Sequence, residues 1–421
     1  MPRDRGVNRN LEIPRSTCRL FGTIKALSTV KRSAILVHGP KGCVYHINYI
    51  LGMRGDRPSA IYSTSLDEQD VIFGAEEKLG SAIEELDRSL SPDLIFVLSC
   101  CASSIIGEDV EGACRGARAR ARVIGFPSGG FEGDHHTAYG EALTRLAEEL
   151  SRPAGPRRPA SVNLVGMLRG GPDLRELRRV LSLAGIGVIG VLSADAALGD
   201  LGRLGEAALN LVVCEPAGRA AAEFLERKYG TPFIVVPFPI GAVAARSFLE
   251  QVTSALGLPF DPGCLAGETG GPGKAREVMP SGERAGEEVR PPLRVAVIGG
   301  PTRAVSMCRF LRDSGIDPVL LVVDFDAGVG EAFAAGDLRN IEVLVAPPQE
   351  EILARLSALD IDLVIGGMAE RPLASMLGIR HLDMMHGSQR TACFAGEREL
   401  AAILAGIRPS PRGGVEPEKP A

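Results

Sequence analysis

Cysteine is the residue type in this sequence with the clearest chemical potential, because its thiolate can act as a nucleophile or bind iron. The chain of 421 residues contains nine cysteines. Three of them stand where a strand-like apolar run ends: Cys43 follows SAILVHG, and Cys100 and Cys101 follow DLIFVLS. A thiolate at a helix N-terminus is stabilised electrostatically, so these positions suit iron binding.

Cys18 precedes the first strong apolar run. Cys43 lies 25 positions after Cys18, and Cys101 lies 58 positions after Cys43. These spacings match no local metal signature such as CxxC. Gly39 and Gly42 would allow a tight turn that brings the backbone close to a group held by the cysteine. The alternative is structural, because cysteines are among the most often buried residues and act as small apolar side chains.

Two further residues stand at comparable places later in the chain. Cys214 follows the run ALNLVV and precedes a helix-like stretch, and His386 lies in RHLDMMHGSQ. His135 and His136 are adjacent in DHHTAYGEAL, and imidazoles can donate protons near neutral pH. Each of these residues also fits a structural interpretation: a buried core thiol, a histidine satisfied by hydrogen bonds, or a pair on a solvated loop.

HGPKGC and GGPTRAV are glycine-containing turns after strand-like runs, and they invite comparison with nucleotide-binding loops. Neither contains GxxxxGK[ST] or GxGxxG, and the lysine of the first precedes its last glycine. The sequence therefore shows no recognisable phosphate loop. If ATP drives the chemistry, we expect another polypeptide to bind it.

Strand-like apolar runs alternate with amphipathic helical stretches throughout the chain. Helical stretches such as GAEEKLGSAIEELDRSL and GRAAAEFLERKYG follow most of the runs, and CASSIIGEDVEGA predicts a helix opened by Cys100 and Cys101. This alternation predicts an α/β fold with parallel sheets flanked by helices. The predicted strands lie at 33–39, 93–99, 162–168, 208–213, 233–238, 294–300, 319–323 and 362–367.

Two breaks divide the chain into three units of the same βα style, so we expect three Rossmann-like domains. The first break is the Pro-rich segment 151–161, and the second is rich in Gly, Pro and charge. In such sheets ligands bind beyond the carboxyl ends of the strands. The predicted parts are a first domain at 1–150, a second at 161–260, a flexible linker at 261–292, a third domain at 293–407 and a disordered tail at 408–421.

Composition excludes several classes of protein. Hydrophobic residues make up 45% and charged residues 24%, which is ordinary for a globular protein, and the net charge of -5 lacks the basic excess of a nucleic-acid binder. No apolar run approaches the roughly 20 residues of a membrane span. The N-terminal sequence lacks the apolar core of a signal peptide. We therefore expect a cytoplasmic protein, in which disulfides are rare and the cysteines are structural, reactive or metal-bound.

The stretches CRLFGTIKALSTVKRSAILVHGPKGCVYHINYI, TSLDEQDVIFGAEEKLGSAI and CCASSIIGEDVEGA resemble the N-terminal domain of the nitrogenase component 1 family. HGPKGC, DVIFG and IIGED carry the resemblance, and LVVCEPAGRAAAEFLERKYGTPF and DLVIGGMAERPLASMLGIRHLDMMHG extend it over most of the chain. The family includes nitrogenase subunits, cofactor-assembly scaffolds, protochlorophyllide and chlorophyllide reductases, and the reductive cyclase of nickel-tetrapyrrole synthesis.

The resemblance implies an iron–sulfur cluster at a subunit interface, [4Fe-4S] or larger, to which each protomer contributes three cysteines. By motif these residues are Cys18, Cys43 and Cys101. Cys101 rather than Cys100 stands six residues before the glycine of IIGED, as the family pattern requires. Cys114, on a helical stretch, would by contrast be structural and should tolerate alanine.

The resemblance also implies a second metallocluster, in a cavity between the three domains. Cys214 and His386 stand where nitrogenase α subunits carry the cysteine and the histidine that hold the catalytic cofactor, whereas His381 would not face that cavity. Nitrogenase α subunits also carry a glutamine and a histidine that face the cofactor. Here the nearest histidines, His135 and His136, stand at shifted positions and are the candidate catalytic proton donors. This shift, together with the shorter chain, favours a nitrogenase-like protein with a substrate other than dinitrogen.

By this resemblance the protein is a nitrogenase-like oxidoreductase subunit. An ATP-dependent iron-protein homodimer would dock around GPKGC and deliver electrons singly, and a homologous or identical component 1 subunit would complete the complex. No nucleic-acid or membrane partner is expected. Two alternatives remain: a scaffold on which a nitrogenase-type cofactor is assembled, and a tetrapyrrole reductase or reductive cyclase subunit with only the first cluster.

Overall fold

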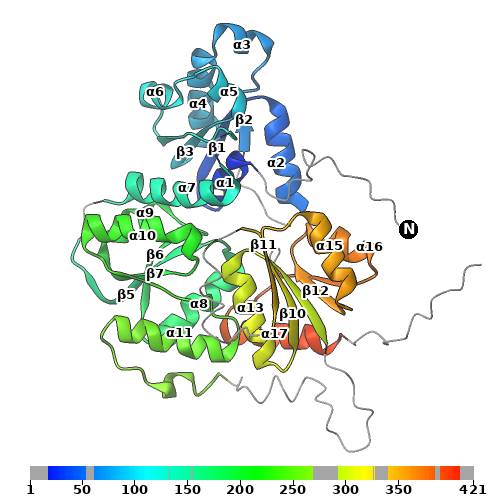
Figure 1. The fold of residues 1–421 in the computed structure, drawn as a ribbon. Coiled ribbons are helices and arrows are strands. Elements are labelled where there is room, and N and C mark those ends of the chain that lie inside the picture. Colours follow the sequence, from blue (N-terminus) through cyan, green and yellow to red (C-terminus); the bar gives the residue numbers. More distant parts are fainter. Residues whose placement is uncertain are drawn as a thin grey trace, which may run out of the picture. The chain divides into compact units, whose positions relative to one another are not determined.

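The computed structural model describes residues 18–53, 61–131, 133–152, 155–268, 293–325, 327, 340–384 and 389–407. Within these residues the chain forms three parallel sheets flanked by helices, so the predicted α/β fold with three Rossmann-like sheets is confirmed (Figure 1). One compact unit holds the first two sheets and residues 389–396, and a second unit holds the third sheet. The predicted tail and most of the predicted linker lie outside the described residues.

The first sheet has the strand order β2-β1-β3-β4. Its central strands are almost wholly buried, and their continuous apolar sequences are typical of parallel strands covered on both faces. The strands are β1 Ser33–His38, β2 Ile61–Ser63, β3 Leu94–Ser99 and β4 Arg122–Phe126. The helices are α1 Arg19–Leu27, α2 Lys41–Met53, α3 Glu68–Phe73, α4 Glu76–Leu90, α5 Cys101–Ile105, α6 Val110–Gly116 and α7 His135–Leu150.

Of two helices predicted in this region, one forms as predicted and the other is interrupted. The stretch GAEEKLGSAIEELDRSL forms α4, which buries Leu79, Ile83 and Leu86 along one face, as its spacing predicts. CASSIIGEDVEGA does not form the single helix predicted for it. Gly107 has a φ of 78°, a left-handed conformation that ends α5, and α6 begins three residues later at Val110. The break places Glu108 between the two helices.

The second sheet has the strand order β6-β5-β7-β8. β8 ends at Val235 although the apolar sequence continues, because Pro237 and Pro239 have no N–H group to donate to a neighbouring strand. β5 begins at Arg158, inside the Pro-rich segment 151–161 that was predicted to separate the first two units. The strands are β5 Arg158–Met167, β6 Gly187–Ser193, β7 Ala207–Val212 and β8 Phe233–Val235. The helices are α8 Gly171–Leu183, α9 Leu198–Gly202, α10 Glu215–Tyr229 and α11 Gly241–Ala255.

The first two sheets share one hydrophobic core, and α7 joins them. α7 packs against α1 on one side and against α10 on the other. A Cβ atom added at Gly140 would lie 3.2 Å from the carbonyl oxygen of Pro216, so glycine permits the close approach of α7 and α10. The shared core runs from Leu98 and Cys100 of the first sheet region through Tyr139 to Cys214 of the second.

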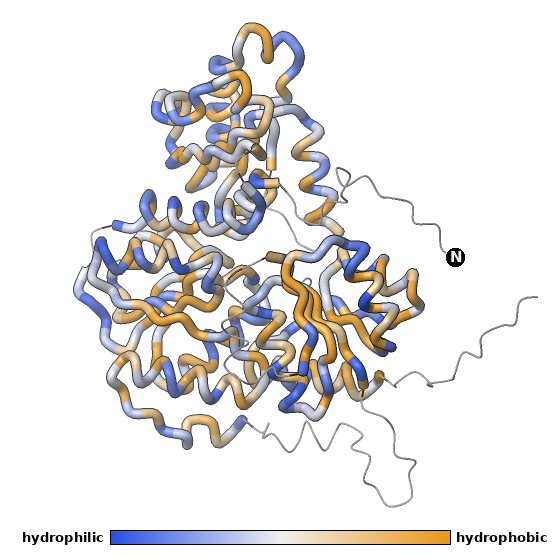
Figure 2. The backbone as a smooth tube through the Cα atoms, in the orientation of Figure 1, coloured by the Kyte–Doolittle hydropathy of each residue, from blue (hydrophilic) through white to orange (hydrophobic). Residues whose placement is uncertain are grey.

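The third sheet has the strand order β11-β10-β9-β12-β13, and Figure 2 shows its central strands as hydrophobic. After β13 the chain returns to the first unit, where Ala392 and Cys393 form β-bridges with Ile240. No helix in the described parts of the chain is long and apolar enough to span a membrane. The elements are β9 Arg294–Gly299, α13 Pro301–Asp313, β10 Asp317–Val323, β11 Glu342–Val345, α15 Gln349–Ala358, β12 Leu363–Gly366, α16 Glu370–Met376, β13 Arg380–Asp383 and α17 Cys393–Ala405.

Candidate metal centre

Two of the predicted cluster cysteines follow neighbouring strands of the first sheet. β1 and β3 run parallel, and their last residues, His38 and Ser99, are partners in the register. Cys43 lies in the first turn of α2, and Cys101 begins α5 directly after β3. Because parallel strands bring their carboxyl ends to the same edge of a sheet, both thiols lie at this edge.

Cys18 reaches the same place from the N-terminal side. It is the exposed N-cap of α1, and its backbone forms an antiparallel bridge with Asp134. A Cβ atom added at Gly130 would lie 3.0 Å from Cys101 Sγ and 3.5 Å from Cys18 Cβ. The amide of Gly130 also donates a hydrogen bond of 3.3 Å to Cys101 Sγ. Cys18 and Cys101 therefore flank a position that only glycine leaves open.

Cys43 meets a fourth thiol, that of buried Cys100. A hydrogen bond between the two thiols raises the pKa of Cys43 and lowers that of Cys100, which also accepts hydrogen bonds from the amides of Ser103 and Ala102. Cys101 and Cys18 act electrostatically on Cys43 as well. Cys100 was not predicted as a site residue from the sequence; the signal that could have found it is its place beside Cys101.

The strand-end cysteines offer several sulfur donors at one edge of the sheet. Within the described residues no group of three His, Cys, Asp or Glu side chains is placed to hold one metal ion. Soft thiolates are the usual ligands of iron–sulfur clusters, which extend over several ångströms. A Cβ atom added at Gly39 would lie 2.4 Å from Cys100 Sγ, so glycines make room on both sides of these thiols. The residues therefore fit the cluster that the sequence predicts.

Other cysteines behave as core residues. Burial raises the pKa of Cys114 and of Cys308 to about 12, and it also raises the pKa of fully buried Cys393. Burial is the main cause at these three thiols, whereas the neighbouring thiol of Cys100 is the main cause at Cys43. Cys114 lies on α6, on the helical segment where a structural role was predicted.

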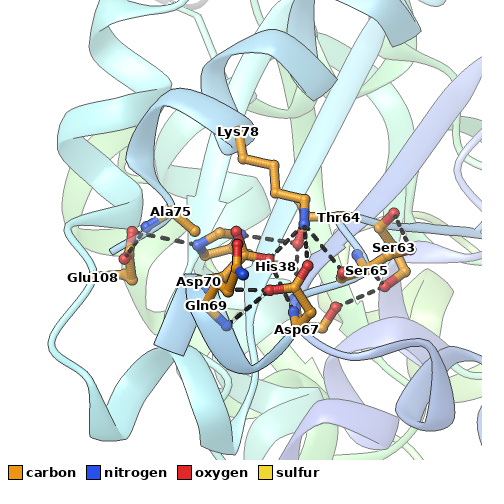
Figure 3. A network of polar contacts seen from close by, with 11 residues as sticks. His38, Ser63, Thr64, Ser65, Asp67, Gln69, Asp70, Ala75, Lys78 and Glu108 are labelled. Atoms are coloured by element: carbon orange, nitrogen blue, oxygen red, sulfur yellow. Dashed lines mark hydrogen bonds and ion pairs between the residues drawn. The ribbon is translucent and has the colours of Figure 1, made fainter. Parts of the chain in front are cut away.

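A buried chain of hydrogen bonds lies behind the Cys43 loop (Figure 3). The amide of Gly39 donates to Thr64 Oγ1 over 3.1 Å, and Thr64 Oγ1 lies 3.0 Å from His38 Nδ1. His38 Nε2 lies 3.4 Å from Glu108 Oε2, and Glu108 Oε1 accepts a hydrogen bond of 2.7 Å from the amide of Ala75. The side chains of His38 and Glu108 are 0% and 5% exposed.

Polar side chains at the surface continue this network around α3. Asp67 caps α3 by accepting hydrogen bonds from the amides of Gln69 and Asp70, and Lys78 forms an ion pair with Asp70 (Figure 3). The hydrogen bond from Lys78 lowers the pKa of Asp70. At the end of the same helix, Ile72 and Phe73 are 72% and 84% exposed. The DVIFG phrase therefore forms an apolar, exposed turn close to the buried network.

The predicted proton donors His135 and His136 open α7. Asp134 caps this helix by accepting from the amide of Thr137, and its Oδ2 lies 2.8 Å from His136 Nε2. The two imidazole rings meet edge to face, with centroids 5.1 Å apart. Asp134 forms a β-bridge with Cys18, a predicted cluster cysteine. The two histidines come directly after Asp134 in the sequence.

Cys214 occupies a different environment, in the apolar core that the first two sheets share. It is the N-cap residue of α10 and is 8% exposed. A Cβ atom added at Gly166 would lie 2.8 Å from the carbonyl oxygen of Cys214. One helical turn into α7, Tyr139 places its hydroxyl 3.2 Å from Ser193 Oγ, and burial raises the pKa of this tyrosine.

His386, the predicted partner of Cys214, lies outside the described residues. The segment that follows it is held by residues between β5 and α8 and on α8: Arg169 donates to the carbonyl oxygen of Gln389 over 2.9 Å, and Asp173 accepts from the amide of Thr391 over 2.7 Å. His381 lies on β13, where its Nε2 is 2.9 Å from the carbonyl oxygen of Gly367. The imidazole of His381 is thus held by a hydrogen bond to the backbone.

Comparison with known proteins places the chain in one family. The model described as "Nitrogenase component 1 type Oxidoreductase" matches residues 18–407. The nitrogenase iron-molybdenum cofactor biosynthesis protein NifE of Methanosarcina barkeri is 28% identical over 397 residues, which cover 89% of this chain and 84% of that protein. The nitrogenase molybdenum-iron protein beta chain of Methanococcus maripaludis is 26% identical, with coverages of 87% and 86%.

A third relative and a solved structure complete the comparison. A light-independent protochlorophyllide reductase subunit of a Methylobacterium species, strain 4-46, is 28% identical over 85% of this chain and 71% of that protein. The structure titled "Nitrogenase Cp1 at pH 6.5" has a TM-score of 0.78, covers 94% of this chain and 92% of that chain, and is 20% identical. At that identity the likeness shows the fold alone.

Proposed function

The chain belongs to the nitrogenase component 1 type oxidoreductase family, and from this premise we propose that Cys18, Cys43 and Cys101 bind an iron–sulfur cluster that receives electrons from an ATP-dependent iron protein. The observation that carries the proposal is the meeting of these thiols around Gly130 and Cys100, at the common edge of β1 and β3. Cys18 is exposed, which suits a cluster completed by a second component 1 subunit, homologous or identical.

The residues around the thiols have definite tasks in this proposal. A bound cluster would supply one-electron transfer. The Gly130 amide donates to Cys101 Sγ and so would orient that thiolate, and Cys43 is held in the first turn of α2. The buried side chains of β1 and β3 exclude water from the sheet behind the site.

Alanine substitution tests the ligand set. Cys18→Ala, Cys43→Ala and Cys101→Ala should each remove most of the iron and the visible absorbance of the cluster. Cys114→Ala is the matched control, since Cys114 is a half-buried thiol of the same sheet region, and it should leave both unchanged. Full iron content in all three single variants would refute the proposed ligands.

The exposed end of α3 and the loop before Cys43 form the proposed docking surface for the electron donor. Ile72 and Phe73 present large apolar groups there, and exposed contiguous apolar groups are typical of protein interaction sites. Lys41 and Tyr45, both exposed on α2, would extend this surface. Because the chain contains no phosphate loop, the purified chain alone should hydrolyse no ATP, and the donor protein should carry that activity.

A second metallocluster at Cys214 and His386 is the less supported half of the proposal. Its support is the position of Cys214 at a strand end and the fixed segment after His386. His135 and His136 are the proposed proton donors for reduction, and the cavity between the domains stays a prediction. Cys214→Ala should lower the iron content while leaving the spectrum of the first cluster intact; unchanged iron would exclude a cluster at Cys214.

Two relatives suggest different roles for the same cytoplasmic complex. The likeness to NifE favours a cofactor-assembly scaffold, and the likeness to the protochlorophyllide reductase favours a tetrapyrrole reductase or a related reductive cyclase. Our first choice is reduction of a small substrate by an oxidoreductase subunit. Iron counting separates the tetrapyrrole alternative, with about four to eight irons per pair of chains, from the other two. Turnover with the donor protein separates enzyme from scaffold.

A further inference from the structure

We propose that His38 and Glu108 form a buried proton-accepting pair that takes up a proton when the adjacent cluster is reduced. The proposal rests on the cluster at Cys18, Cys43 and Cys101. The donor protein supplies one electron to the cluster, and solvent supplies one proton to His38, which becomes an imidazolium. The local charge therefore stays the same.

The hydrogen bonds around His38 assign its ring proton in the resting state. A carboxylate only accepts hydrogen bonds, so in a neutral imidazole the proton lies on Nε2, which faces Glu108, and Nδ1 is left as an acceptor for the hydroxyl proton of Thr64. His38 is thus a neutral imidazole that donates to an ionised carboxylate, an assignment made from the network.

The same network accepts a proton without displacing any heavy atom. A hydroxyl oxygen has two acceptor lone pairs, and the Gly39 amide occupies one of them on Thr64. When Nδ1 gains a proton, the Thr64 hydroxyl rotates and accepts from Nδ1–H on its second lone pair. Glu108 then lies beside a full positive charge, while the Ala75 amide still binds its other oxygen.

The surroundings of His38 act on its pKa in opposite directions. Burial is the largest influence and lowers the pKa below its ordinary value, whereas hydrogen bonding and charge from Glu108, and the charges of Cys100 and Asp70, raise it in part. Lys78 offsets Asp70 by an ion pair. An electron added to a nearby cluster is one more negative charge, and in a buried, weakly screened environment it favours the imidazolium.

Both members of the pair are attached to the segments that carry the thiols. His38 is followed by Gly39, which packs against Cys100 Sγ, and Cys100 precedes the proposed ligand Cys101. The amide of Glu108 donates 3.1 Å to the carbonyl oxygen of Ser103 in α5. Protons enter from the Glu108 side, because its side chain keeps 5% exposure and that of His38 has none.

A redox titration at several pH values tests the pair. The full chain, purified with its partner subunit and cluster, is titrated between about pH 6 and pH 8.5, and the reduced cluster is followed by electron paramagnetic resonance. In the wild type the midpoint potential should fall as pH rises, by up to about 59 mV per unit, which is the one-electron value of a tenfold change in proton concentration.

Two nearly isosteric variants should remove this dependence. Glu108→Gln keeps an acceptor for the Ala75 amide but removes the charge, and His38→Asn keeps an acceptor for Thr64 but cannot take the proton. In each variant the midpoint potential should not change with pH. Asp70→Asn is the matched control, because it removes a carboxylate that influences His38 through charge but makes no hydrogen bond to it; its slope should match the wild type.

Other results would overturn the proposal. Wild-type slopes in both variants, or a flat profile in the wild type, would exclude the pair as the proton site. If the variants lose the cluster, photoreduction of the wild type with a pH-indicator dye measures proton uptake directly, and no uptake contradicts the proposal. Absence of any cluster in the wild type would instead overturn the proposed function itself, and this inference with it.

Discussion

Cysteines follow strands both at the edge of the first sheet and in the second sheet, yet their surroundings differ. At the first edge, Gly39 and Gly130 make room beside the thiols, the thiols act on one another, and the ionisable pair of His38 and Glu108 lies behind them. Cys214 lies in the apolar core that the two sheets share, to which Cys100 also belongs. A strand-end position alone therefore does not define a metal site; the neighbouring thiols and the charged pair distinguish the first region.

Glycine substitutions should separate the two regions most strongly. Gly166 has a φ of 79°, and an added Cβ would meet the backbone of Cys214, so Gly166→Ala combines strain with overpacking and should cost about 3 kcal/mol of unfolding free energy. In Gly39→Ala the added Cβ would meet the side chain of Cys100, chiefly its sulfur, and the substitution should cost about 2 kcal/mol. Denaturant unfolding of both variants provides the measurement.

The cause of the second effect can be checked by a double-mutant cycle. In Gly39→Ala combined with Cys100→Ala the obstructing sulfur is gone, so the combined loss should be smaller than the sum of the two single losses. Additive losses would show that Gly39 is needed for some reason other than its contact with Cys100.

The pH dependence of stability should distinguish the first region from the second, with a smaller effect than the glycine substitutions. Because burial lowers the pKa of His38 in the folded chain, the unfolded chain binds a proton at a higher pH than the folded chain does. Stability therefore rises with pH, and the penalty appears as pH falls below about 6.5, the ordinary histidine value. His38→Asn should reduce this loss between pH 7.5 and pH 5.5, and a loss equal to that of the wild type would contradict the assignment.

The smallest expected effect belongs to the second region. Tyr139→Phe removes the hydroxyl that meets Ser193 and leaves Ser193 Oγ without that partner, at a cost of about 1 kcal/mol. Thermal unfolding measures the loss, and the spectrum of the first cluster should not change. A change in that spectrum would indicate that the two regions are coupled through α7.

The fold was predictable where strands are buried on both faces. The run at 33–39 matches β1, and the run at 93–99 matches β3, because central parallel strands are continuously apolar. β2 has three residues and β13 reads RHLD, and neither was among the predicted strands. Both lie at sheet edges, where short or polar sequences are tolerated and leave no periodic signal.

The candidate site was predictable only as far as its motifs reach. Cys43 and Cys101 stand in short sequence motifs that resemble those of the family, and both lie at the same sheet edge. The contact of His38 with Glu108 joins residues 70 positions apart and depends on the turn at Gly107, which the predicted single helix did not contain. Such pairings arise from tertiary packing and leave no local sequence signal.

The central claim is that the thiols at the edge of the first sheet hold an iron–sulfur cluster. X-ray absorption at the iron edge of the purified wild-type complex, compared with Cys101→Ala, tests it most directly. We predict iron surrounded by sulfur with iron neighbours in the wild type, and loss of the signal of the first cluster in the variant. Iron bound only by oxygen or nitrogen, with no iron neighbour, or an unchanged spectrum in Cys101→Ala, would contradict the claim.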